Sequence, residues 1–181
     1  MAAVPVRIRD FEPEDFDRLW QIDQECFAPG ISYSRQELKT YMRRRGSFTL
    51  VAEKLAVEKL VVEKEDRRPD LPNAAKHAEA DTHSRIQGFI VAYGGRTGHI
   101  ITIDVIAPAR RTGLGSRLLA AAEDRLRTSR SQAVGLETAV DNAAAIAFYK
   151  RHGYSVAGTW PRYYSNGVDA LVMRKQLQAQ N

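Results

Sequence analysis

The chain of 181 residues contains a single cysteine, Cys26, and only four histidines. One cysteine cannot form an internal disulfide, so a disulfide-stapled scaffold is excluded and a reducing compartment fits the composition. Cys26 falls in an expected amphipathic helix without a histidine nearby in sequence, which favours packing as a small buried residue over nucleophilic catalysis. No cysteine or carboxylate cluster with metal-ligand spacing surrounds His77 and His83, so we predict no metal site.

Long apolar runs are also missing. No segment approaches the ~18 apolar residues that cross a bilayer, and the first residues carry no signal-like apolar stretch. We therefore expect no membrane association and, by default, a cytoplasmic protein. The net charge of +5 suits an anionic partner, but an arginine-rich tail and a basic stripe interleaved with aromatics are both lacking. Direct nucleic-acid binding is accordingly not expected.

The length and the 44% hydrophobic content predict one globular domain over residues 1–181. A charged insertion at about residues 54–85 interrupts it between two expected strands, at residues 48–52 and 86–93. Its first part repeats Glu-Lys pairs, and its later part is rich in charge, proline and alanine, which indicates a loop. The insertion is either a partner-binding element or an elaborated hairpin without function.

The most informative segment runs from an expected strand at residues 100–106, through a basic glycine turn, into an expected helix at residues 113–129. The turn reads Arg111-Thr-Gly-Leu-Gly-Ser116. Two glycines let the backbone approach a ligand, and the free amides of a helix N-terminus next to arginines attract phosphate groups. The spacing matches neither the P-loop nor the dinucleotide-binding fingerprint. The turn therefore predicts a pyrophosphate site of a different kind.

Periodicity and capping signals predict the remaining elements. Strands are expected at residues 6–9, 134–140, 154–159 and 169–174, and helices from Pro13, from the capping box Ser34-Arg-Gln-Glu37 and from Asp141 to Gly153. Alternation along the strand at 134–140 places Glu137 on the face opposite Leu136. Asn142 and Tyr149 lie on one stripe of the last helix, about 10.5 Å apart along its axis. An elongated ligand beside that stripe can contact both.

Two separate segments resemble one known family. Arg110-x-x-Gly113-x-Gly115 is similar to the acetyl-coenzyme A loop of the GNAT (GCN5-related) N-acetyltransferases, and Asp141-Asn-Ala-Ala-Ala-Ile-Ala-Phe-Tyr-Lys-Arg-His-Gly-Tyr154 resembles a later helix of that family. Within the family, Leu136-Glu137, Pro161-Arg-Tyr-Tyr164 and Asp169-Ala-Leu-Val-Met173 resemble the RimI-type ribosomal-protein alanine N-terminal acetyltransferases. The resemblance covers residues 100–174 well and the N-terminal part in outline.

The resemblance implies an α/β GNAT fold, a mixed and mostly antiparallel sheet flanked by helices, with acetyl-CoA held where two central parallel strands diverge. The implied acetyl-CoA contacts are Ile103, Asp104, Val105, Arg110, Arg111, Thr112, Gly113, Leu114, Gly115, Ser116, Asn142 and Tyr149, with the strand backbone at Ile103 to Val105 pairing with the pantetheine amides. The implied acceptor contacts are Tyr33, Tyr163 and Tyr164. No metal is implied.

The implied reaction is acetyl transfer to an amine. Glu137 is the expected general base, through an ordered water, and Tyr149 the general acid that protonates the departing coenzyme thiolate. An α-amine with a pKa of ~7.7–8.0 is about one-tenth neutral at pH 7, whereas a lysine near ~10.4 is almost wholly protonated. An N-terminal α-amine therefore needs less help from a general base than a lysine does. We expect the acceptor to be the N-terminus of a protein or peptide, with a ribosomal protein as one candidate.

Alternatives stay open at this point. Where the RimI pattern reads Leu-Glu-Val-Arg, this chain has Leu136-Glu-Thr-Ala139, so peptide selectivity does not carry over. A small-molecule amine or a lysine side chain is an alternative acceptor. A non-catalytic acetyl-CoA sensor is a third reading, which the presence of both Glu137 and Tyr149 disfavours. Each of these residues also has an interpretation without a catalytic or binding role. Tyr149 can be a core aromatic, Asn142 a helix cap and Glu137 a solvated carboxylate.

Overall fold

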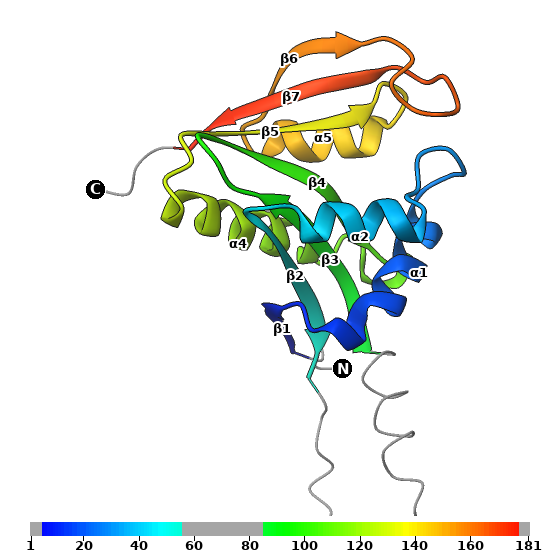
Figure 1. The fold of residues 1–181 in the computed structure, drawn as a ribbon, viewed down its shortest axis with the longest axis vertical. Helices are drawn as coiled ribbons and strands as arrows, with labels where there is room; N and C mark the ends of the chain where they lie inside the picture. Colours follow the sequence, from blue (N-terminus) through cyan, green and yellow to red (C-terminus); the bar gives the residue numbers. More distant parts are fainter. Residues whose placement is uncertain (1–4, 56–84, 178–181) are drawn as a thin grey trace, which may run out of the picture.

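A computed structural model describes residues 5–55 and 85–177 of the chain, which form one seven-stranded sheet with helices on both faces (Figure 1). The strands are β1 (Val6–Asp10), β2 (Ser47–Lys54), β3 (Ile86–Tyr93), β4 (Thr97–Val105), β5 (Ala133–Ala139), β6 (Ser155–Trp160) and β7 (Ala170–Gln176). The helices are α1 (Phe16–Cys26), α2 (Arg35–Arg43), α4 (Leu114–Thr128) and α5 (Ala143–Arg151), with short 3-10 turns η1 (Pro13–Asp15) and η2 (Ala107–Ala109). The predicted insertion lies, apart from its ends, outside the described residues.

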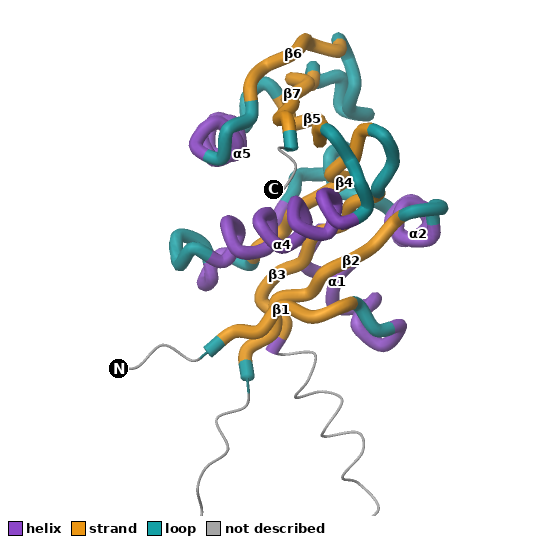
Figure 2. The backbone as a smooth tube through the Cα atoms, turned by 90° about the vertical axis from the view of Figure 1, so that its left-hand side faces the viewer, coloured by secondary structure: helices purple, strands orange, loops and turns teal. Residues whose placement is uncertain are grey.

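The strand order is β1-β2-β3-β4-β5-β7-β6, and every neighbouring pair is antiparallel except β4 with β5. Helices α1 and α2 cover one face, while α4 and α5 lie on the other, as the side view shows (Figure 2). The expected fold class, a mixed and mostly antiparallel sheet flanked by helices, is confirmed.

Local signals placed most of the elements. Ser34 Oγ accepts from the Glu37 amide and the Glu37 carboxylate accepts from the Ser34 amide, so the predicted capping box starts α2. Two expectations need correction. Pro13 begins a 3-10 turn that leads into α1 rather than α1 itself, and Asn142, not Asp141, caps α5, because its Oδ1 accepts from the Ala145 amide.

The parallel pair at the centre of the sheet is short. β4 and β5 are in register only at Thr97 with Ala133, Gly98 with Val134 and His99 with Gly135, and beyond these residues the two strands separate. A bulge at Ile101 bends β4 at the same place, since Ala92 pairs with Ile100 and Val91 with Thr102. The separation opens the middle of the sheet.

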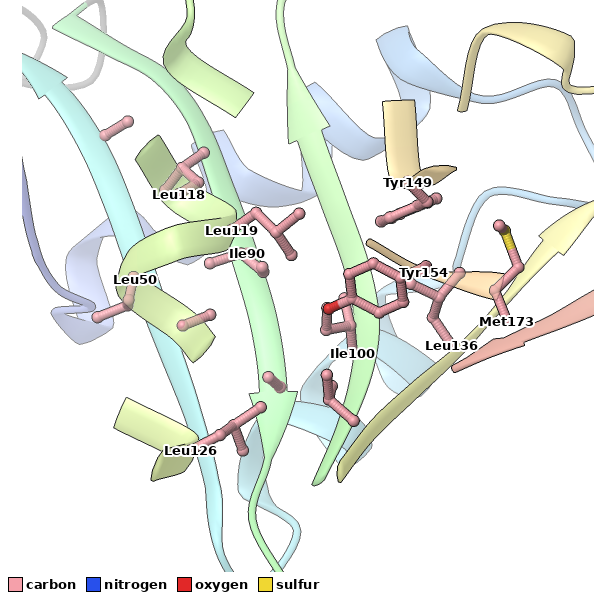
Figure 3. Packing of buried hydrophobic residues seen from close by; sticks show 14 of the residues in the cluster. Leu50, Ile90, Ile100, Leu118, Leu119, Leu126, Leu136, Tyr149, Tyr154 and Met173 are labelled. Carbon is pink, nitrogen blue, oxygen red and sulfur yellow. The ribbon is translucent and has the colours of Figure 1, made fainter. Parts of the chain in front are cut away.

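Packing on the α4 face joins the two halves of the sheet. Leu118 and Leu119 of α4 lie against Ile90 of β3, and Leu136 of β5 and Tyr149 of α5 belong to the same cluster (Figure 3). A second cluster fills the opposite face, under α1 and α2. The two cores hold β3, β4 and β5 rigidly around the opening.

Candidate active site

A cleft of about 1320 Å³ occupies the opening between β4 and β5. Its lining comes from the loop between α1 and α2, the end of α2, β3, β4, the glycine turn, β5, α5 and the connection between β6 and β7. The glycine turn lies at one end, where β4 stops. Aromatic side chains from α2, β3 and the β6–β7 connection line the other end. The cleft thus reaches both faces of the sheet.

The glycine turn is held in a strained conformation. Arg111 (φ 62°) and Gly113 (φ 84°) both adopt left-handed backbone angles, and Gly113 is the N-cap of α4. A glycine cap offers no side chain to the first amides of the helix, which therefore stay available to an anion. The pyrophosphate site predicted from the sequence has the geometry of such an anion site.

A histidine that sequence reasoning overlooked lies beside this turn. His152 Nε2 is 2.8 Å from Ser116 Oγ, in the first turn of α4. Burial lowers the pKa of His152, so its ring is neutral at pH 7. The contact fixes the Ser116 hydroxyl at the edge of the anion site.

The structure brings most of the predicted acetyl-CoA contacts to one surface. Those that line the cleft are Ile103, Val105, Arg110, Arg111, Gly113, Gly115, Ser116, Asn142 and Tyr149. The Ile106 amide donates to Gln87 of β3, and alternate residues of a strand turn the same way, so the backbone groups of Ile103 and Val105 face the cleft. The Val105 carbonyl already accepts from Arg110 Nε at 2.9 Å.

Three predicted contacts have side chains that do not line the cleft. Asp104 does not line the cleft, because alternation along β4 turns its side chain to the α1 face, where it is 1% exposed. Thr112 donates its hydroxyl to the Ala109 carbonyl, and the Leu114 side chain packs in the core. The side chains of these three residues are structural parts of the strand and turn.

Asp104 is a buried carboxyl beside the cleft. Its Oδ1 accepts from Thr102 Oγ1 at 3.0 Å, and its Oδ2 has no hydrogen-bond partner among the described residues. Burial, and then the nearby carboxylate of Asp23, raise the pKa of Asp104 well above its ordinary value. Burial likewise raises the pKa of Asp23 to about 6. A proton held by Asp104 in the folded protein is lost on unfolding.

This linkage predicts a pH-dependent stability. A carboxyl whose pKa is raised by folding stabilises the protein below its unfolded pKa of ~3.9, and that stability is lost as the pH rises through the folded pKa. We expect Asp104→Asn to raise the Tm at pH 8 by about 3–6 °C and to flatten the fall of Tm between pH 5 and 8. Thermal unfolding across this pH range tests it, with the exposed Asp17→Asn as control. A Tm lowered at pH 8 would contradict the prediction.

Glu137 makes a side-chain contact with a histidine that the sequence did not suggest. His99 Nε2 on β4 is 2.9 Å from Glu137 Oε2 on β5. His99 belongs to the last pair of the β4–β5 register, with Gly135, and Glu137 lies two residues beyond that pair, where the strands have begun to separate. The His99 ring stacks on Tyr93 of β3, with centroids 5.3 Å apart, and the Arg44 guanidinium lies 4.0 Å above the Tyr93 ring. His99, Tyr93 and Arg44 all line the cleft and were missed. No local sequence pattern links His99 to Glu137, because the register between β4 and β5 joins them.

Tyr149 stands in the cleft on the other side, on α5. Its ring packs edge-on against Phe148 and Tyr154, and the residue is only 6% exposed. Burial raises the pKa of Tyr149 well above the ordinary tyrosine value. The phenol therefore keeps its proton across the physiological pH range and can donate it to a group in the cleft.

Tyr33 is held in place by both its backbone and its side chain. Its amide donates to Asp23 Oδ2, and its carbonyl accepts from the side chains of Trp20 and Gln24. Its hydroxyl donates to the Ile101 carbonyl at the β4 bulge. The predicted acceptor contact Tyr33 thus lies in the cleft wall next to the point where β4 and β5 separate.

Tyr163 and Tyr164 form part of the aromatic end of the cleft. The two rings meet edge-on at 5.0 Å, and Tyr163 also packs against Trp160. Burial raises the pKa of Tyr163 to about 12, with further contributions from the neighbouring Glu137, Tyr41 and Tyr93. These side chains surround one space.

The loops on either side of that space touch each other. Ser165 Oγ donates to the Gly30 carbonyl at 3.0 Å, which ties the β6–β7 connection to the α1–α2 loop. Gly30 has φ 88°, and a Cβ there would meet Asn166 Cβ at 2.9 Å. The contact requires glycine at this position.

Cys26 is partly buried; it packs against the core under α1 and α2, as expected, and also lines the cleft. Its thiol donates to the Val105 carbonyl, and Arg110 Nη2 donates to its sulfur, both at 3.5 Å. Burial raises the pKa of the thiol to about 11, so it is protonated at pH 7 and a poor nucleophile. The described residues contain no group of three or more side chains suited to a metal ion. Within residues 5–55 and 85–177, no helix has the length and apolar character required to span a bilayer.

Several known proteins with similar sequences are named N-alpha-acetyltransferases. N-alpha-acetyltransferase 30 of Schizosaccharomyces pombe is 37% identical over 74 residues, which cover 41% of this chain and 49% of the relative. The N-alpha-acetyltransferase of Sulfurisphaera tokodaii is 34% identical over 83 residues, covering 45% and 50%. The chain spans about half the length of these curated relatives.

Solved structures share the whole fold. Ard1 from Thermoplasma volcanium superposes with a TM-score of 0.73 at 24% identity, over 96% of this chain and 98% of that one. The ribosomal-protein-S18-alanine N-acetyltransferase from Escherichia coli gives 0.72 at 19% identity, over 98% and 97%. At these identities the likeness concerns the fold. The profile of the acetyltransferase (GNAT) family matches residues 16–154, and the chain therefore belongs to the GNAT family.

Proposed function

We propose that the protein transfers the acetyl group of acetyl-CoA to the N-terminal α-amine of a protein or peptide. The observation that carries the proposal is the placement of a base and an acid across one cleft. The Glu137 and His99 pair stands where β4 and β5 separate, and the buried, protonated Tyr149 faces the same space from α5. The names of the similar proteins point to the same acceptor.

The anion site places the donor. Arg110, Arg111 and the first amides of α4 hold the pyrophosphate, and the cleft-facing backbone of Ile103 pairs with the pantetheine arm. Asn142 caps α5 through its Oδ1 and also lines the cleft, where it can contact the pantetheine arm. The thioester then lies near the point where β4 and β5 separate, beside Tyr149.

Two proton transfers accompany the reaction. Glu137, supported by His99, takes a proton from the acceptor amine, through a water if one bridges the gap, and the amine nitrogen attacks the thioester carbonyl. The carbon–sulfur bond breaks, and Tyr149 gives its proton to the coenzyme thiolate. Tyr33, Tyr163 and the loop contact at Gly30 wall the acceptor side, which suits an extended peptide end.

We expect Tyr149→Phe to lower kcat more than tenfold while the Kd for acetyl-CoA changes less than about twofold, because only the proton donor is lost. Stopped-flow turnover and calorimetric titration measure the two quantities. Tyr154→Phe is the matched control, since the Tyr154 hydroxyl donates to Glu123 in the core and not into the cleft. Unchanged kcat in Tyr149→Phe would remove the tyrosine from the mechanism.

A peptide library tests the function as a whole. The protein is incubated with acetyl-CoA and peptides of which half have blocked N-termini, and fragmentation mass spectrometry locates each acetyl group. Acetyl on free N-termini alone supports the proposal and yields the preferred sequence. Acetyl only on lysine or on small amines would overturn the acceptor class. A ribosomal protein as acceptor and a cytoplasmic location stay predictions.

A further inference from the structure

Arg44 is an exposed residue that lines the cleft and stacks on Tyr93 at its aromatic end. It follows the last residue of α2, where its amide donates to the Tyr41 carbonyl and its carbonyl accepts from the Ser47 amide. Its guanidinium lies 4.0 Å above the Tyr93 ring, and both residues line the cleft. Such stacking uses the flat face of a guanidinium and leaves its N–H edges free to bind.

The charge of Arg44 has no carboxylate partner within the described part of the chain. Several other arginines are paired: Arg9 with Asp15, Arg35 with Asp17 and Arg127 with Asp124. An arginine that stacks on a ring at a cleft wall with free donor edges is suited to bidentate binding of a carboxylate. The feature therefore points to a ligand group of negative charge.

This group is not a phosphate of the acetyl donor. The glycine turn with Arg110 and Arg111 lies at the opposite end of the cleft, beside α4 on the other face of the sheet from α2 (Figure 2). Arg44 is instead joined to Glu137 through the stacked rings of Tyr93 and His99. An extended peptide advances ~3.3 Å per residue, so a peptide whose amine lies at Glu137 reaches Arg44 within its first few residues.

We propose that Arg44 forms a carboxylate subsite that selects acceptor peptides with aspartate or glutamate at the second to fourth residue. The inference rests on the proposed function and narrows its substrate class. Tyr93 is a positioning residue, since it holds the guanidinium by stacking. His99 and Glu137 separate the subsite from the reacting amine, so the charge selects the peptide without entering the proton transfer.

The test compares matched peptides with free N-termini that differ only by glutamate or glutamine at residue two, three or four. The wild-type protein is expected to show a kcat/KM at least about fivefold higher for glutamate at one of these positions, mostly through KM, with a preference that weakens as salt is added. Arg44→Gln is expected to bring the ratio to about one. Arg44→Glu is expected to favour the corresponding lysine peptide.

Arg45→Gln is the matched control, because the neighbouring Arg45 is exposed like Arg44 but does not line the cleft. This variant should keep the wild-type ratio between the two peptides. Equal rates with glutamate and glutamine peptides in the wild type, or a preference that survives in Arg44→Gln, would overturn the inference while acetylation itself still supports the proposed function. Failure to acetylate any free N-terminus would overturn the proposed function and the inference with it.

Discussion

Replacing Gly113 with valine is expected to raise the Kd for acetyl-CoA by about 100-fold or more, because two effects act at one residue. Gly113 has φ 84°, a backbone angle that a β-branched side chain adopts only with strain. No atom lies within 4 Å of the position of its missing Cβ, so the valine meets no core residue and projects beside the anion site. Isothermal titration with acetyl-CoA measures the loss.

Gly167 provides a control matched for strain. It also has a positive φ, 82°, with no atom within 4 Å of its missing Cβ, but it lies in the turn between β6 and β7. We expect Gly167→Val to retain acetyl-CoA affinity, with thermal unfolding showing that both variants are folded. Equal loss of affinity in the two variants would show that strain alone is responsible and would contradict the assignment of the anion site.

Replacing Glu137 with glutamine is expected to lower kcat by about 100-fold at pH 7, in the range typical of a lost general base. Glutamine has nearly the same shape and can still accept from His99 Nε2, so the local packing is retained. The affinity for acetyl-CoA should stay close to that of the wild type, because Glu137 lies at the far end of the cleft from the glycine turn. Single-turnover assays with a free N-terminal peptide measure the effect.

The pH dependence of the same variant separates a base from a structural residue. An α-amine with a pKa near ~8 is about one-tenth neutral at pH 7 and about nine-tenths neutral at pH 9. The solvent therefore takes over the removal of the proton as the pH rises, and the deficit of Glu137→Gln should shrink toward pH 9. A deficit that is constant with pH would mean that Glu137 orients the acceptor but does not accept its proton.

Local sequence patterns were sufficient to predict most helices and strands. The capping box at Ser34, the alternation around Glu137 and the left-handed glycine after α5 were readable because each involves residues within one turn or strand. The wrong predictions concerned where individual helices begin. Asn142 rather than Asp141 caps α5, since both residue types serve as caps and only backbone geometry chooses between neighbours.

The predicted acetyl-CoA contacts on β4 do not all face the same side of the sheet. The sequence named the run from Ile103 to Val105 as a unit, but alternate residues of a strand face opposite sides, and the bulge at Ile101 shifts that alternation. Asp104 is consequently buried under α1 instead of facing the cleft. No sequence pattern within β4 predicts the bulge, because the bulge arises from the pairing of β4 with β3.

The sequence by itself predicted the helices, most strands and the anion-binding turn, since these depend on spacings of a few residues. The resemblance to the GNAT family, and not spacing, supplied Glu137 and Tyr149 as candidate base and acid. Tertiary structure alone decided what surrounds them. His99 meets Glu137 through the short parallel register of β4 with β5, and Arg44 meets Tyr93 through the packing of α2 on the sheet. Contacts such as these, between residues far apart in the sequence, are set by strand pairing and core packing, which no local pattern predicts.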